Sequence, residues 1–106
     1  MSAARRYRGA MDATVAAEGN ELRVTGEIDA HSVSVVDAAL AETDPTSEIA
    51  LDLSGVSFID SSGLRALVAA HKRTEAAGGG LVLVDPSQPV LRLLGLTGLD
   101  QVLTIR

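Results

Sequence analysis

Residues 49–64 have the sequence IALDLSGVSFIDSSGL and predict a strand that leads almost directly into a helix. Three large apolar residues fall on every second position, the period of a strand with one buried face: Ile49, Leu51 and Leu53. We expect this strand to end at Ser54-Gly55, and a second apolar group follows at 56–59. The polar run after it, Asp60-Ser61-Ser62-Gly63, therefore marks a strand-to-helix turn.

The helix that begins at this turn is predicted from a change of apolar period. Apolar or bulky residues recur at i, i+3, i+4 and i+7 and define the predicted buried stripe: Leu64, Leu67, Val68 and His71. The glycine run 78–80 is typical of a helix end. We therefore expect a helix of several turns with its amino terminus at the Ser61-Ser62 pair.

Before this unit, the chain predicts a hairpin and a helix. Strand patterns at residues 11–17 and 21–25 flank Gly19-Asn20, a pair that suits a hairpin turn. Helical spacing follows at 33–43, and two polar residues precede it as candidate N-caps, Asp29 and Ser32.

After the glycine run, the sequence predicts a strand at 81–84, a short helix around 90–94 and a last strand at 102–105. Strands that alternate with helices through short connections favour a parallel sheet. The predicted fold class is α/β: one domain with a mixed, mostly parallel sheet, an opening hairpin and about three packed helices.

The chain has 106 residues, of which 46% are hydrophobic, and this suits one compact domain. We expect residues 11–106 to form it. Residues 1–10 contain Arg5, Arg6 and Arg8 without apolar periodicity. We therefore predict a flexible basic arm over 1–10.

Charge and composition argue against several classes of partner. The formal net charge is −5, and residues 11–106 alone carry six basic and fourteen acidic groups, or −8. Nucleic-acid-binding surfaces have the opposite sign. There is no cysteine for a disulfide or a thiolate metal site, and no long apolar segment. We expect a cytoplasmic protein with no nucleic-acid or membrane partner.

The familiar enzyme motifs are absent from the sequence, including the phosphate-binding loop, the GxSxG elbow and the HExxH pair. His71 lies on the predicted buried stripe, and nothing completes a triad around His31. A hydrolase with Ser61 as nucleophile therefore has no evident base. We predict no catalytic residue, no metal and no cofactor.

The Ser61-Ser62 pair is the most informative polar feature. Unpaired N–H groups and the positive end of the helix dipole favour negative groups at such a position. An N-cap role accounts for one serine only. The second serine, the neighbouring Asp60 and the acidic segment Gly26–Asp29 together favour a site that another protein acts on.

Three blocks of sequence carry a family resemblance. They are Gly26-Glu27-Ile28-Asp29, the run from Asp52 to Leu64, and Leu96-Thr97-Gly98-Leu99. In this order and spacing the chain resembles, over about residues 11–106, the STAS domain of bacterial anti-sigma factor antagonists. It differs from the family pattern at Arg65, often a small residue in the best-known antagonists, and at Arg106, where many relatives continue into a final helix.

The resemblance implies a protein that binds an anti-sigma factor with serine-kinase activity of the GHKL type and so frees a sigma factor. Phosphorylation switches such antagonists off, and the family's phosphorylated position falls on Ser61, less plausibly on Ser62. A PP2C-type phosphatase restores the active form. The candidate partner-binding residues are Glu27, Asp29, Asp60, Ser61, Ser62, Gly63, Leu64 and Arg65.

STAS domains also serve in scaffolds and in transporters. The alternative function is therefore a non-switching scaffold or a transporter-associated regulatory subunit, in which the serine pair only caps the helix.

Overall fold

The computed structural model describes residues 4–8 and 13–106, which form one six-stranded sheet and three α-helices. The strands lie in the sheet in the order in which they occur along the chain. The elements are β1 (Arg5–Arg8), β2 (Thr14–Glu18), β3 (Glu21–Ile28), α1 (Val33–Ala41), β4 (Glu48–Ile59), α2 (Ser61–Ala77), β5 (Gly80–Val84), α3 (Gln88–Thr97), a 3-10 turn (Leu99–Gln101) and β6 (Thr104–Ile105).

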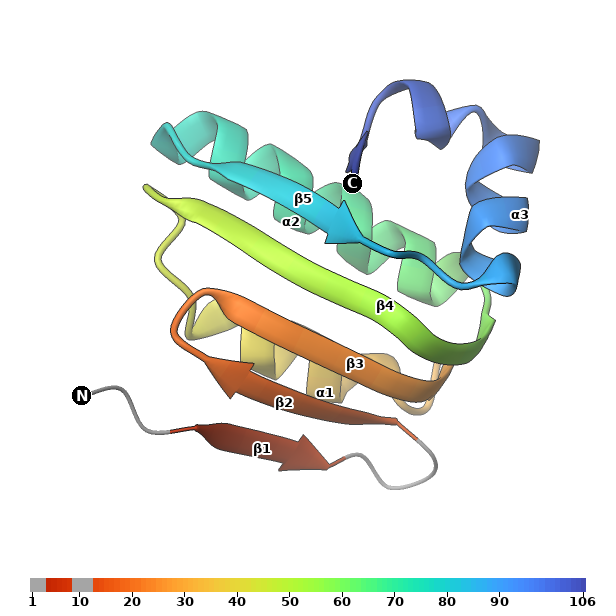
Figure 1. Cartoon of the computed structure of the whole chain (residues 1–106), viewed down its shortest axis with the longest axis horizontal. Helices are drawn as coiled ribbons and strands as arrows, with labels where there is room; N and C mark the ends of the chain where they lie inside the picture. Colours follow the sequence, from red (N-terminus) through yellow and green to blue (C-terminus); the bar gives the residue numbers. More distant parts are fainter. Residues whose placement is uncertain (1–3, 9–12) are drawn as a thin grey trace.

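The sheet is antiparallel at one edge and parallel in the remainder. β1, β2 and β3 pair antiparallel, whereas β3, β4, β5 and β6 pair parallel. α1 and α2 cover one face of the sheet, and α3 lies at the end where β4 leads into α2 (Figure 1). This arrangement confirms the predicted α/β class, including the opening hairpin and the three helices.

The core lies between the sheet and the helices α1 and α2. Alternate residues of β2, β3 and β4 point toward these helices and are buried, as the period of two predicts: Val15, Ala17, Leu22, Val24, Ile49, Leu51 and Leu53. On α2, however, Val68 and His71 are only half-buried, while Ala66 and Ala70 are buried. α2 packs on α1 as well as on the sheet, and this turns its buried stripe toward the small residues.

β4 is longer than the sequence predicted. It does not end at Ser54-Gly55 but runs on to Ile59. The pairing with β3 changes register here, with Thr25 opposite Gly55. A Cβ atom on Gly55 would lie 2.7 Å from Cγ2 of Thr25, so glycine allows the two strands to approach at the irregularity. The extra residues bring Phe58 and Ile59 into the sheet.

The prediction of a flexible arm over residues 1–10 is wrong for Arg5–Arg8. These four residues form β1 and pair with β2 in the register Arg5↔Ala17 to Arg8↔Thr14. β1 has no apolar alternation because it pairs along one edge only and buries only part of one of its faces. Residues 1–3 and 9–12, and with them the rest of the predicted arm and the start of the predicted 11–17 strand, lie outside the described residues.

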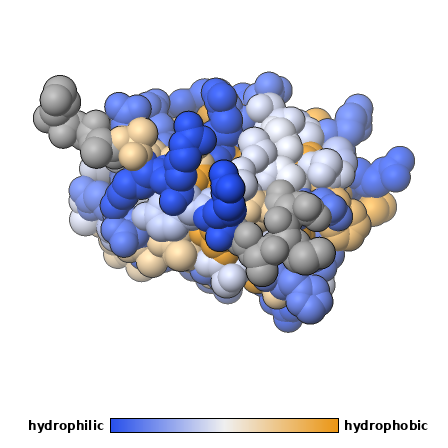
Figure 2. All heavy atoms as spheres, turned by 90° about the horizontal axis from the view of Figure 1, so that it is seen from below, coloured by the Kyte–Doolittle hydropathy of each residue, from blue (hydrophilic) through white to orange (hydrophobic). Residues whose placement is uncertain are grey.

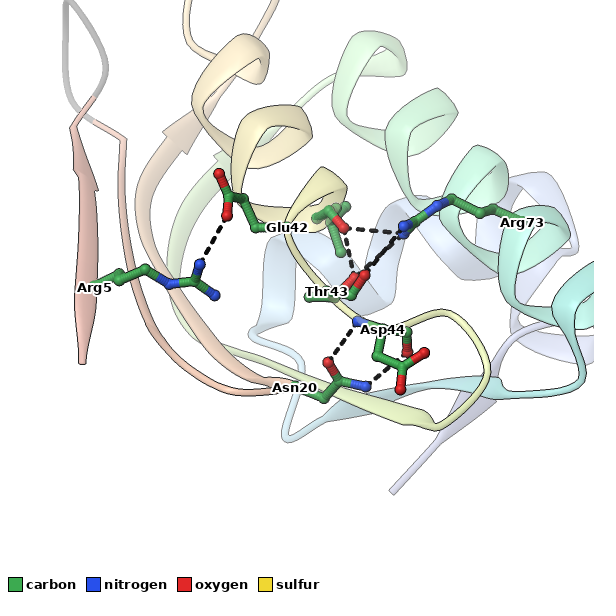
Figure 3. A network of polar contacts seen from close by, with 7 residues as sticks. Arg5, Asn20, Glu42, Thr43, Asp44 and Arg73 are labelled. Carbon is green, nitrogen blue, oxygen red and sulfur yellow. Dashed lines mark hydrogen bonds and ion pairs between the residues drawn. The ribbon is translucent and has the colours of Figure 1, made fainter. Parts of the chain in front are cut away.

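Side-chain bonds fix the carboxyl end of α1, which lies at Ala41 rather than at the predicted residue 43. Arg73 of α2 donates to the carbonyls of Leu40 and Thr43, at 3.0 and 3.1 Å (Figure 3). The carbonyl of Leu40 also accepts from the N–H of Thr43, so Arg73 adds to a turn that already ends the helix.

At the other end of the chain, the predicted strand 102–105 shrinks to Thr104–Ile105. A 3-10 turn at Leu99–Gln101 precedes it, and the N–H groups of Val102 and Leu103 donate to the carbonyl of Leu99, so these two residues continue the turn rather than the strand.

At Gly63, α2 packs against the last residues of β3 and β4 with no space for a side chain. A Cβ atom there would lie 2.7 Å from Cγ1 of Ile59 and 2.8 Å from Cγ2 of Ile28. We expect Gly63→Ala to lower the free energy of unfolding by about 1–3 kcal/mol, because two core side chains must move. Urea unfolding followed by circular dichroism measures the change.

Gly95→Ala is the matched control, because a Cβ atom at this helical position meets nothing within 4 Å. It should raise the free energy of unfolding by about 0.5–1 kcal/mol. Equal effects of the two substitutions would contradict the close packing of α2 at Gly63.

Candidate functional site

Two neighbouring parallel strands end together and bring two acidic loops side by side. Ile28 of β3 lies opposite Ile59 of β4. One residue further on, the N–H of Asp60 donates to the carbonyl of Ile28 at 3.1 Å. The predicted Gly26–Asp29 segment and the Asp60-Ser61-Ser62-Gly63 turn therefore meet at the carboxyl ends of β3 and β4. Figure 1 places α3 at the same end of the sheet.

Asp60 caps α2. Its Oδ1 accepts from the N–H of Ser62 at 2.8 Å and, more weakly, from that of Gly63 at 3.4 Å. Its backbone is extended, with φ −117°, as is typical of an N-cap residue. The alternative interpretation, in which a serine of the pair caps the helix, is not what the structure shows, because Asp60 occupies the cap position and both serines lie inside the first turn.

The two serines differ in exposure. Ser61 is exposed, and its hydroxyl makes no hydrogen bond to any described residue. Ser62 is half-buried and contributes its backbone N–H to Asp60. A nucleophilic or acceptor oxygen at the molecular surface is thus provided by Ser61 rather than by Ser62.

Asp29 orders the loop that precedes α1. Its Oδ1 accepts from the N–H groups of His31 and Ser32, at 2.9 and 3.0 Å, and from the Ser32 hydroxyl at 3.1 Å. The hydrogen bond from the Ser32 N–H is the main reason that the pKa of the Asp29 carboxyl lies below its ordinary value of 3.8. The carboxylate is half-buried and charged at neutral pH.

Ser32 occupies the N-cap position of α1 but makes no side-chain cap bond. Its single hydroxyl proton is directed to the carbonyl of Glu27 at 2.7 Å and is shared with the more distant Oδ1 of Asp29. The loop between β3 and α1 is therefore held in shape from within, with Asp29 at its centre.

The predicted contact residues do not all reach the surface. Gly63 and Leu64 are buried, and they support the turn from its core side. Arg65 is exposed one turn of helix after Ser61, while Glu27 is half-buried at the end of β3. The site that the fold assembles therefore presents carboxylates, one exposed hydroxyl and one exposed guanidinium.

Two grooves flank this turn, and sequence reasoning missed both. A cavity of about 320 Å³ between α1 and α2 is lined by Ala30, Ser62 and Arg65 among others. On the other side, a groove of about 410 Å³ runs between the end of β4 and α3, with Phe58 and Leu96 on its wall. Phe58 is 45% exposed and Leu96 79% exposed. The sequence signal for the second groove was its two large apolar residues, Phe58 and Leu96, which lie beside polar motifs.

The family comparison identifies the fold and its relatives. A model of the STAS domain matches residues 11–106. The chain belongs to the STAS domain family. An anti-sigma F factor antagonist of Paenibacillus polymyxa is 32% identical over 87 residues, which are 79% of this chain and 74% of that protein. An anti-sigma-B factor antagonist of Listeria monocytogenes is 36% identical over 88 residues, covering 81% and 77% of the two chains.

Solved structures agree with this assignment. The crystal structure of an anti-sigma factor antagonist from Mycobacterium paratuberculosis superimposes with a TM-score of 0.69 at 26% identity, and covers 99% of this chain and 83% of that one. The predicted resemblance to STAS-domain anti-sigma factor antagonists is confirmed.

The imidazole of His71 contacts the carboxylate of Glu75 one turn further along α2. Within residues 4–8 and 13–106, no group of three or more acidic or histidine side chains is placed to hold a metal ion. No helix in the same ranges is long and apolar enough to cross a membrane.

The cap assignment gives the second prediction. We expect Asp60→Ala to lower the free energy of unfolding by about 0.5–2 kcal/mol, because two backbone N–H groups lose their acceptor. Asp60→Asn should retain most of the stability, and Ser61→Ala should change it by less than about 0.5 kcal/mol. Thermal unfolding of the three variants measures these effects. A larger loss of stability in Ser61→Ala than in Asp60→Ala would contradict this assignment and make Ser61 the N-cap residue.

The third prediction concerns pH. Because the pKa of Asp29 is lower in the folded chain than its ordinary value of 3.8, its bonds stabilise the fold above that value. This contribution is lost as the pH falls through the folded pKa. Carboxyl-detected NMR titration should place the Asp29 pKa below 3.8, and Ser32→Ala should raise it part of the way back. A folded-state pKa above 3.8 would contradict the loop geometry.

Proposed function

We propose that this STAS domain binds a serine-kinase anti-sigma factor of the GHKL type, thereby frees a sigma factor, and is switched off by phosphorylation of Ser61. The proposal rests mainly on Ser61. Its hydroxyl is exposed and makes no hydrogen bond to a described residue, and it lies at the start of α2 beside two ordered acidic loops. The relatives of at least 30% identity are antagonists of anti-sigma factors, which supports the general role.

The contact surface is centred on the turn. Asp29, Asp60 and Ser61 lie at its middle, with Arg65 on α2 at one side. Ser62 and Glu27 contribute through their partly exposed atoms, and Gly63 and Leu64 act by holding the turn in shape. The two flanking grooves offer apolar walls for partner side chains, as expected of an interface with a buried centre and a polar rim.

A phosphate on Ser61 changes this surface without changing the fold. It adds about −1.5 to −2 charges at neutral pH. The N-terminal end of α2 tolerates that charge, and Arg65 lies four residues later, on the same helical face. The carboxylates of Asp29 and Asp60 repel it, as would acidic groups of the partner. The modification therefore removes binding through charge and bulk at the interface.

The partner supplies the chemistry of the switch. The kinase provides ATP, its metal ion and the base that accepts the serine proton, and a PP2C-type phosphatase reverses the modification. This chain contributes a substrate side chain rather than catalytic groups, and acts in the cytoplasm. The alternative of a non-switching scaffold or transporter-associated subunit assigned the serine pair to helix capping, a role that Asp60 fills.

The fourth prediction tests the switch. Ser61→Ala should bind the cognate anti-sigma factor with the affinity of the unmodified chain in the presence of ATP, because it cannot be phosphorylated. Ser61→Asp should bind at least about tenfold more weakly, a loss near 1.4 kcal/mol. Titration calorimetry gives both affinities, and mass mapping after incubation with the kinase locates the phosphate.

Ser62→Ala is the matched control and should still be phosphorylated. Asp29→Asn retains the oxygen that accepts the loop hydrogen bonds, so a weaker affinity with an unchanged melting temperature would assign Asp29 to the interface. Phosphate mapped to Ser62, or recovery of a membrane transporter in place of a kinase from cell extracts, would overturn the proposal.

A further inference from the structure

β1 is the described strand that lies outside the family match, and it is strongly basic. The STAS match covers residues 11–106, whereas β1 is Arg5–Arg8. Three of its four residues are arginine, while residues 11–106 carry a formal net charge of −8. A cationic strand therefore pairs with an otherwise acidic domain, outside the segment that the family model matches.

β1 forms one edge of the sheet. Its inner side pairs with β2 over four residue pairs, and no described strand lies on its outer side (Figure 1). The outer main-chain N–H and C=O groups of an edge strand form a template on which another strand can pair. Extended segments of partner proteins bind in this way, with alternate side chains providing specificity.

The pairing register divides the arginines between the two faces of the sheet. Arg5 lies on the side of α1, where its Nη1 donates to Oε2 of Glu42 at 2.8 Å (Figure 3). Arg6 and Arg8 lie on the opposite face, because successive side chains of a strand alternate. The bond of Arg5 therefore attaches β1 to the domain and leaves Arg6 and Arg8 to face outward.

Arg6 and Arg8 line a cavity of about 240 Å³ together with Arg23 of β3. The cross-strand rows are Arg6–Ala16–Arg23 and Arg8–Thr14–Thr25, so small side chains form the floor between the arginines. Arg6 and Arg8 make no ion pair with any described residue, and Arg23 lies 3.5 Å from Asp52. Figure 2, a view from the β1 side, shows strongly hydrophilic side chains gathered along this edge.

A second copy of β1 is an unsuitable occupant. Every antiparallel register of this strand against itself that pairs three or more of its residues sets an arginine directly opposite an arginine. Like charges in directly opposed positions destabilise strand pairing. The same arginines favour a strand with carboxylates at alternate positions, because Arg6 and Arg8 lie two residues apart on one face.

We propose that β1 is a docking edge for an acidic extended segment of a partner protein, which adds to the sheet as a further strand. Its main chain pairs with the outer edge of β1, and carboxylates at alternate positions contact Arg6 and Arg8 above the cavity. β1 is separated from β4 by three strand spacings, about 14 Å. The segment therefore binds without covering the turn that contains Ser61.

The test is an NMR titration of the isotope-labelled full chain with the peptide acetyl-Thr-Glu-Val-Glu-Thr-Glu-amide, which alternates acidic residues. We expect saturable shifts of the backbone amides of β1 and β2. Arg6→Glu should weaken the binding about fivefold or more, since an exposed attractive pair becomes a repulsive one. Lys72→Glu, an equal charge reversal on the exposed side of α2, should leave the affinity unchanged.

Two further ligands separate strand addition from attraction of charge. The same peptide with alternate amides methylated keeps every carboxylate but loses main-chain donors, and it should not bind. Inorganic phosphate should give no saturable shifts in β1. Binding of the methylated peptide equal to that of the parent, saturable binding of phosphate at β1, or no binding of the parent peptide would each overturn the proposal.

Discussion

The Asp60 side chain and main chain together determine the geometry of this domain's functional end. The carboxylate accepts from the N–H groups at the start of α2, and the Asp60 N–H donates to the carbonyl of Ile28 at the end of β3. One residue therefore fixes where the helix begins and how close the two acidic loops lie. Glycine is required at position 63, in the first turn of α2, because Ile28 and Ile59 leave no space for a Cβ atom. The exposure of Ser61 follows from this arrangement, since Asp60 already provides the cap.

A binding surface that is regulated by charge benefits from loops that are already ordered before the partner binds. Asp29 is held by N–H groups of its own loop and Ser32 by the carbonyl of Glu27, as the β4–α2 turn is held by Asp60. Both loops are therefore ordered by bonds within the chain. A preorganised surface loses less conformational entropy on association. We therefore propose that charge added at Ser61 by phosphorylation acts on binding rather than on folding. The basic edge at β1 lies three strands away, which allows the two surfaces to be occupied independently.

The sequence predicted the fold class and the strand-to-helix turn, because alternation in 49–53 and helical spacing from Leu64 are local signals. It did not distinguish Asp60 from the serines as the cap, since both residue types cap helices well. β1 was missed because Arg5–Arg8 has no apolar alternation, and its pairing depends on β2 and on Glu42 of α1. The grooves beside Ser61 arise from the packing of α1, α2 and α3, which no local pattern encodes.

We propose that the adjoining β3–α1 and β4–α2 turns form the surface that meets the anti-sigma factor. Hydrogen–deuterium exchange of the chain, alone and in complex with its cognate anti-sigma factor, tests this most directly. We expect the amides of residues 27–32 and 60–65 to be protected on binding and those of β1 to exchange as in the unbound chain. Protection confined to β1, β2 or the hairpin between β2 and β3, with those two turns exchanging as in the unbound chain, would contradict it.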